Sequence, residues 1–143
     1  MALKQLTIFV ENKQGTVVAV TDILARQGIN IRALSIAETE GFGILRLIVD
    51  NEAAAETILN QEGYLIKTTD VVGVKIGDAP GKLSTALKVL SEAGINVDYL
   101  YAFMARTERH AYVVLRVADN DEAESVLTNA GYHIITDADV NKL

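Results

Sequence analysis

The chain carries an internal repeat, and this repeat limits its fold more than any other feature. Gly-Ile-Asn occurs at residues 28–30 and returns 66 residues later, at residues 94–96. Gly15 recurs as Gly81 at the same spacing. Repetition at a fixed spacing indicates two copies of one structural unit. We therefore expect two domains, over residues 1–69 and 70–143.

Hydrophobic residues recur within each copy at the periods of strands and helices. Leu6, Ile8 and Val10 alternate with other residues, which is typical of a half-buried strand. Leu83, Ala86 and Leu90 have the spacing of one helix face. Val72–Ile76 is expected to open the second copy as a strand. The later strands are expected at Asn30–Ala37, Gly43–Val49 and Tyr64–Thr68, and then at Asn96–Met104, Ala111–Val117 and Tyr132–Thr136.

Each copy therefore has the element order strand, helix, strand, strand, helix, strand. Each strand–helix–strand connection is right-handed and leaves room for one strand between the two that it joins. The result is an antiparallel sheet of strand order 4-1-3-2 with both helices on one face. The predicted fold class is α+β, with the ferredoxin-like βαββαβ sandwich present twice.

Composition excludes several classes of function. The 143 residues are 50% hydrophobic and 22% charged, which is the balance of a folded globular protein. The net charge is −6 and the 13 Lys and Arg are scattered, which argues against a nucleic-acid partner, because duplex binding needs clustered basic residues. The chain has no cysteine and no apolar run long enough for a membrane span. We expect a cytoplasmic protein with no membrane partner.

No residue pattern indicates catalysis. His110 and His133 lack the spacing of metal ligands and are interpreted as surface or packing residues. No serine lies in a nucleophile motif. The acidic run at residues 119–124 suits the start of a helix. We therefore expect no catalytic residue, no metal site, no cofactor and no enzyme activity.

The turns before the first helix of each copy are the most informative segments. Gly15 and Gly81 let the backbone turn sharply and approach a ligand closely. The helix that follows presents N–H groups that suit a carboxylate. Both turns also suit an ordinary helix start without a ligand. Asn30 and Asn96 likewise suit either a local turn or a contact with a ligand.

Aromatic side chains distinguish the second copy from the first. Tyr99, Tyr101 and Phe103 form a stripe on one strand face, whereas positions 33, 35 and 37 of the first copy hold only Ala or Ser. The stripe fits two interpretations. The two copies have slightly different cores, or the stripe is a complementary surface between copies or between chains.

The chain resembles the ACT domain in both copies. Asp-Ala-Pro-Gly-Lys-Leu at residues 78–83, followed by Leu87, Leu90 and Gly-Ile-Asn-Val at 94–97, carries the resemblance in the second copy. The first copy matches with Gly15, Leu24 and Gly-Ile-Asn-Ile at 28–31. It departs at Gln14, where the family often has proline. The resemblance covers essentially the whole chain.

The resemblance implies a fold and a set of site residues. ACT domains commonly sit side by side and merge their sheets into one of eight strands, with ligands at the interface. One site would combine a first-copy loop with a second-copy strand start, namely Asn12, Gln14, Gly15 and Thr16 with Asn96 and Val97. The other would combine Asp78, Ala79, Pro80, Gly81 and Lys82 with Asn30 and Ile31. The two loops differ, so the sites are not expected to be equivalent.

The resemblance also implies a function. By this resemblance, the chain is expected to be a non-catalytic, allosteric regulatory or sensor protein. It would bind a small amino acid between two ACT-like domains and regulate a metabolic enzyme or pathway. One alternative is a ligand-free protein–protein interaction module, and another is a regulatory subunit of an amino-acid biosynthetic enzyme. A small enzyme on the same fold is disfavoured because acid–base residues are missing. The expected partners are an amino acid, a metabolic enzyme and a second copy in a homodimer.

Overall fold

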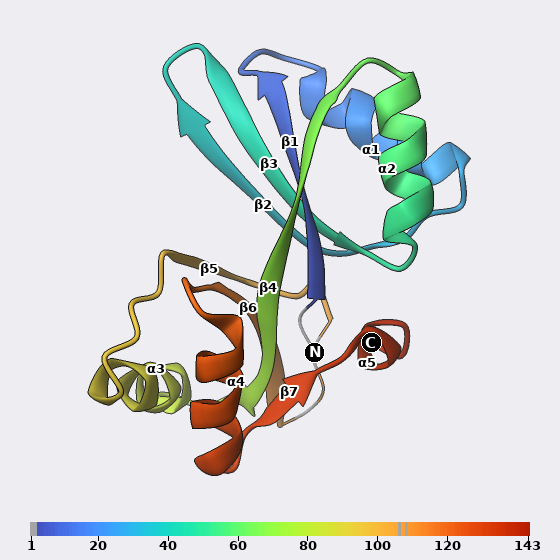
Figure 1. Ribbon diagram of the computed structural model, residues 1–143. Helices are drawn as coiled ribbons and strands as arrows, with labels where there is room; N and C mark the ends of the chain where they lie inside the picture. The colour runs from blue at the N-terminus through green and yellow to red at the C-terminus, as the bar shows by residue number, and fades with distance from the viewer. Residues whose placement is uncertain (1–2, 106, 108) are drawn as a thin grey trace. The chain divides into compact units, whose positions relative to one another are not determined.

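The computed structural model describes residues 3–105, 107 and 109–143, and contacts divide the chain into two compact units (Figure 1). The first unit is Lys4–Thr69, and the second is Asp70–Leu143 together with Leu3. Within the described residues, no helix combines the length and the apolar character that a membrane crossing requires.

The first unit is a sheet covered on one face by two helices (Figure 1). Its strand order is β4-β1-β3-β2, and β3 pairs antiparallel with both β1 and β2. This order is the predicted 4-1-3-2. Its elements are β1 (Leu3–Glu11), α1 (Thr16–Arg26), β2 (Ile31–Thr39), β3 (Phe42–Val49), α2 (Glu52–Gln61) and the start of β4 (Leu65–Gly77).

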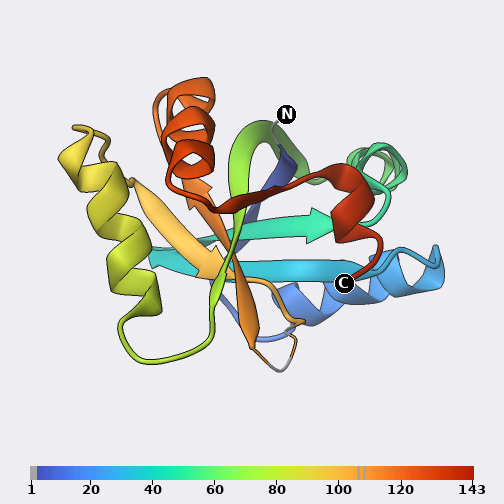
Figure 2. The ribbon, with the colours of Figure 1, turned by 90° about the horizontal axis from the view of Figure 1, so that it is seen from below.

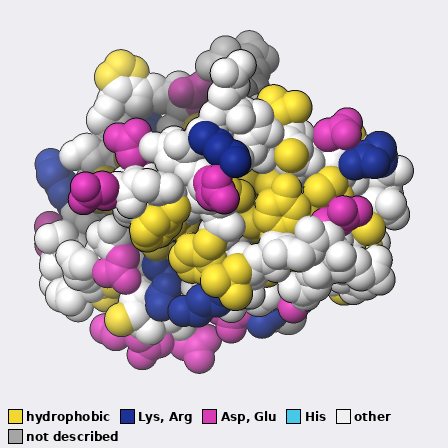
Figure 3. Space-filling view, turned by 90° about the horizontal axis from the view of Figure 1, so that it is seen from above, with side chains coloured by type: hydrophobic (Ala, Val, Ile, Leu, Met, Phe, Trp, Pro, Cys, Tyr) yellow, Lys and Arg dark blue, Asp and Glu magenta, His cyan; other side chains and the backbone are white. Residues whose placement is uncertain are grey.

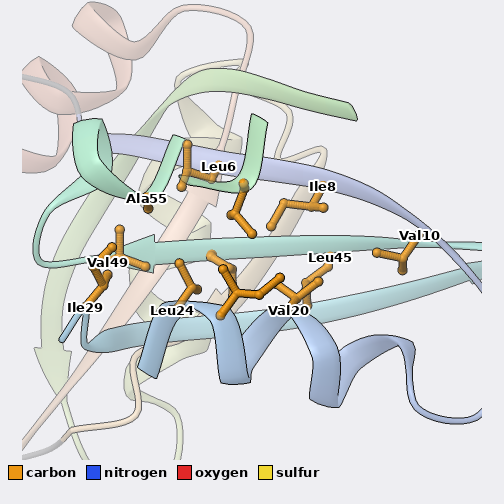
Figure 4. Packing of buried hydrophobic residues seen from close by; sticks show 12 residues of the cluster. Leu6, Ile8, Val10, Val20, Leu24, Ile29, Leu45, Val49 and Ala55 are labelled. Carbon is orange, nitrogen blue, oxygen red and sulfur yellow. The ribbon is translucent and has the colours of Figure 1, made fainter. Parts of the chain in front are cut away.

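Alternation along β1 builds the core of the first unit. Leu6, Ile8 and Val10 point toward the helices and pack with Val20 and Leu24 of α1 (Figure 4). Leu6, Ile8, Val20 and Leu24 are completely buried. Full burial of an aliphatic side chain of this size contributes about 1.5–3 kcal/mol. The helix face and the strand face predicted from sequence are therefore the two sides of one core.

The second unit repeats this architecture (Figure 2). Its strand order is β7-β4-β6-β5, again 4-1-3-2, and α3 and α4 lie next to each other. Val72, Val74 and Ile76 of β4 pack with Leu90 and Leu127 from the two helices. Its elements are the rest of β4, α3 (Lys82–Glu92), β5 (Tyr99–Ala102), β6 (His110–Arg116), α4 (Asn120–Asn129), β7 (His133–Ile135) and α5 (Asp137–Val140).

Strand β4 changes the expected number of strands. The closing strand expected at Tyr64–Thr68 and the opening strand expected at Val72–Ile76 are one strand, Leu65–Gly77, that serves both units. The described residues therefore form seven strands, where eight were expected. The reason is local, because the intervening residues Thr69, Asp70 and Val71 include neither glycine nor proline to break the extended backbone.

Two further boundaries differ from the prediction. The strand expected at Asn96–Met104 is only β5, Tyr99–Ala102. The side-chain amide nitrogen of Asn96 donates to Asp98 Oδ1 at 3.1 Å, and such local side-chain bonding competes with strand pairing.

Helix α5 was not expected from the sequence. A capping box between Thr136 and Asp139 begins this helix. The backbone N–H of Thr136 donates to the Asp139 carboxylate, and this hydrogen bond, with the one to His133, lowers the pKa of the Asp139 carboxyl from its usual value.

Gly73 in β4 lies where the second unit has no room for a side chain. A Cβ at this position would lie 2.7 Å from Leu3 Cδ1 and 3.0 Å from Ile135 Cβ. We expect Gly73→Ala to lower the free energy of unfolding by about 1–3 kcal/mol, since overpacking forces neighbours to shift. Urea-induced unfolding measures this change.

Gly43→Ala is the matched control in β3 of the first unit. A Cβ there would meet Val10 Cγ2 at 3.5 Å, an ordinary contact, so the free energy of unfolding should stay constant or rise slightly. Equal stability of Gly73→Ala and the unchanged chain would contradict the packing described for β4.

Candidate functional site

In each unit, a glycine in the left-handed region directly precedes a helix. Gly15 is the N-cap of α1 with φ +89°, and Gly81 is the N-cap of α3 with φ +85°. Residues that carry a side chain rarely adopt this backbone conformation, so the turn requires glycine. Neither glycine can cap its helix with a side chain, and the first-turn N–H groups of both helices have no side-chain cap at this position.

The first loop is folded onto itself by Thr16. The Thr16 hydroxyl lies 2.9 Å from the backbone oxygens of both Glu11 and Lys13. The side-chain amide nitrogen of Asn12 donates to Glu38 Oε2 at 3.4 Å, which directs the Asn12 side chain toward the hairpin between β2 and β3. Gln14 is exposed. The loop is therefore held by the Thr16 hydroxyl within it and by Asn12, which ties it to the hairpin.

The second loop has the same backbone turn but a different surface. The backbone N–H of Asp78 donates to the carbonyl of Arg109 at 2.9 Å, and Ala79 and Pro80 are exposed. The stem of Lys82 lies against Gly77, where an added Cβ would be 3.0 Å from Lys82 Cγ. Gly77 therefore leaves room for the lysine to lie along the loop.

The two predicted asparagines both follow the first helix of their unit. The backbone N–H of Asn30 donates to Asp50 Oδ1 at 3.0 Å, and its carbonyl accepts from the Asp50 N–H at 3.1 Å. Ile31 then begins β2. Asn96 and Val97 lie between α3 and β5, before the strand begins. Asn30 and Ile31 are therefore at the strand start that was predicted, and Asn96 and Val97 just precede theirs.

The structure brings Gln14, Gly15 and Thr16 together around a hollow of about 520 Å³ in the first unit. Glu11 and Lys13 also line the hollow. Its apolar walls are Phe9, Val10, Ala19, Tyr64 and Leu65, and Gly63 completes it. Sequence reasoning did not include these wall residues. The repeated Gly63-Tyr64 pair, which returns as Gly131-Tyr132, is the signal that marks this turn as a shared feature.

The two predicted ligand sites each take residues from both units. The combination of either loop with a strand start of the other unit stays a prediction. Within the described residues, no three His, Asp or Glu side chains are grouped as metal ligands. His133 instead lies 3.0 Å from Asp139 through Nε2, at the start of α5.

Two of the three residues of the aromatic stripe are buried within the chain. Tyr101 is 7% exposed and Phe103 is 6% exposed, and the Tyr99 and Tyr101 rings stack with centroids 6.4 Å apart. The interpretation of the stripe as a surface for another chain is therefore wrong for Tyr101 and Phe103, because side chains buried within one chain are not available to a second.

The chain matches a family model over its whole length, and solved structures share its fold. The model describes an ACT domain pair and matches residues 1–143. Protein BT0572 from Bacteroides thetaiotaomicron is 38% identical with a TM-score of 0.92, over 100% of this chain and 98% of that one. The regulatory subunit of aspartate kinase from Thermus thermophilus, in its ligand-free form, is 16% identical with a TM-score of 0.67, over 90% and 92%.

At 16% identity, the second likeness shows the fold alone. No curated protein sequence matches the chain. The family model covers both copies of the repeat, including both glycine turns. This match over the whole length establishes that the chain belongs to the ACT domain-pair family.

Proposed function

We propose that the chain is a non-catalytic regulatory module that binds a free amino acid and controls a metabolic enzyme or pathway. The observation that carries the proposal is the recurrence of an uncapped, left-handed glycine turn before α1 and before α3 in an ACT domain pair. Two such turns in one chain supply two places for a small anionic group.

An amino acid is a zwitterion, and the loops offer partners for both of its charges. First-turn N–H groups of a helix suit a carboxylate. Asn12 donates through its amide nitrogen, which leaves its amide oxygen to accept from an ammonium group. These features support the proposed sites, in which Gly15 and Thr16 act with Asn96, and Gly81 and Lys82 act with Asn30. A ligand that binds one conformation of the chain more tightly than another would raise the population of that conformation.

The proposed target is an enzyme of amino-acid metabolism in the cytoplasm. One structural neighbour is named as a regulatory subunit of aspartate kinase, and this chain covers 92% of its length. This neighbour supports the proposal that the present chain has a regulatory role.

A homodimer is part of the proposal. Strand β2 is the last strand of the first unit, nine residues long, and pairs with β3 on one side. Among the described strands none pairs with the other edge of β2, and the edge of an end strand offers N–H and C=O groups to another chain. Ile36 of β2 is also half exposed. Sedimentation equilibrium should give a mass of two 15.5 kDa chains at micromolar concentration, and a mass of one chain would contradict the dimer.

Calorimetric titration with each of the twenty common amino acids tests ligand binding. We expect at least one to bind, and Gly81→Val to remove one of the two proposed sites. A β-branched residue reaches positive φ only at a cost of about 1–2 kcal/mol, so the loop backbone would move away from its binding geometry. The measured quantity is the number of amino acids bound per chain.

Gly131→Val is the matched control for this substitution. Gly131 has φ +93° and open space around a Cβ, but it lies in the turn between α4 and β7, outside the proposed sites. The control should lose similar stability and keep its full binding. Unchanged binding by Gly81→Val, or no heat with any amino acid from folded protein, would contradict the proposal and favour a ligand-free interaction module.

A further inference from the structure

The hollow of the first unit has apolar walls that remain open to solvent. Phe9 of β1 is 36% exposed and Leu65 of β4 is 69% exposed, and both border the hollow. Figure 3 views the end of the first unit at which β1 finishes and β4 begins, and hydrophobic side chains lie at the surface there. Apolar area left in water favours a ligand that covers it, at about 25 cal/mol for each Å².

The size of the hollow suits a small molecule. Its volume of about 520 Å³ lies within the range of roughly 300–1,000 Å³ that is typical of ligand pockets. Ala19 of α1 borders it with a single methyl group, although it is an exposed helix position where a larger side chain would fit. The small residue at this position therefore leaves the hollow open.

A pair of opposite charges lies at the edge of the hollow. Lys13 Nζ is 2.9 Å from Glu11 Oε2, and both side chains are about two-thirds exposed. Such an exposed ion pair contributes little to stability, typically about 0–1 kcal/mol. Both groups can therefore turn to a ligand at low cost. A ligand with an ammonium and a carboxylate on the same carbon atom would complement this pair.

The second unit keeps the glycine turns and the tyrosine of this region but differs at four positions around the hollow. Lys75 stands where the first unit has Phe9, and His133 stands where it has Leu65. Lys82 replaces the short Thr16, and its stem lies along the loop against Gly77. Gly77 in turn occupies the place of Glu11 and has no carboxylate. The apolar side chains of Phe9 and Leu65 and the paired charges therefore belong to the first unit alone.

We propose that the hollow of the first unit binds a free amino acid with a large apolar side chain, branched or aromatic. The side chain lies between Phe9 and Leu65, the ammonium group meets Glu11 beside Asn12, and the carboxylate meets Lys13 together with the N–H groups at the start of α1. This inference rests on the proposed function of amino-acid binding and adds the chemical class of the ligand and its position within one unit.

Calorimetric titration of the full chain with leucine, isoleucine, phenylalanine, serine and glycine tests the ligand class. We expect at least tenfold tighter binding of the three apolar amino acids than of serine or glycine. Leucine amide and N-acetyl-leucine should each bind at least tenfold more weakly than leucine, because each lacks one of the two charges.

Ala19→Phe tests the position by filling the hollow from an exposed helix site. It should lower leucine affinity at least tenfold. Thr85→Phe is the matched control, because Thr85 is the exposed equivalent of Ala19 on α3. The control should leave leucine affinity unchanged. If Ala19→Phe fails to fold by circular dichroism, Leu65→Ser gives the same test, with reduced affinity for leucine expected.

The outcomes separate this inference from the proposed function. Preferential binding of serine or glycine would overturn the inference and leave amino-acid binding intact. Leucine binding that neither Ala19→Phe nor Leu65→Ser weakens would also overturn it, because the ligand would lie elsewhere. No binding by any common amino acid to folded protein would overturn both.

Discussion

The structure depends on burying one face of each sheet beneath two helices. In the first unit, Leu6 and Ile8 of β1 meet Val20 and Leu24 of α1, and these four side chains are completely buried. The second unit buries Val72 and Val74 under α3 and α4 in the same way. Because strand side chains alternate, this packing fixes which residues of each strand face away from the helices.

Strand β4 contributes side chains to the cores of both units. Its first residues close the sheet of the first unit, where Ile66 packs against the first core. Its later residues open the sheet of the second unit, where Gly73 accommodates Leu3 and Ile135. A single strand satisfies both cores, because no glycine or proline interrupts it between the two units and the extended backbone keeps its period of two.

The sequence was sufficient to predict the parts of the fold that depend on local pattern. The strand order 4-1-3-2, the helix faces and the turns at Gly15 and Gly81 follow from periodicity and from the conformational freedom of glycine. The shared strand was not predicted, because a junction between two strands lacks a signal when no turn residue marks it. Helix α5 was missed because it is four residues long and depends on a capping box.

The candidate site was predicted in part for the same reason. The loop residues carry a motif, whereas the walls of the hollow come from Phe9, Ala19 and Leu65, which are far apart in sequence and have no motif. Only the folded unit shows that they face one space. Their replacement at the corresponding positions of the second unit gives two similar backbones different chemistry, which supports the proposal that the two sites are unequal.

Amide hydrogen exchange of the full chain, with and without saturating leucine, tests the central claim most directly. The account predicts slower exchange over residues 11–19 in the first loop and the start of α1 when leucine is present, because a bound ligand holds the loop against local opening. Unchanged exchange in this segment, with slower exchange elsewhere, would contradict the placement of an amino acid at the first glycine turn.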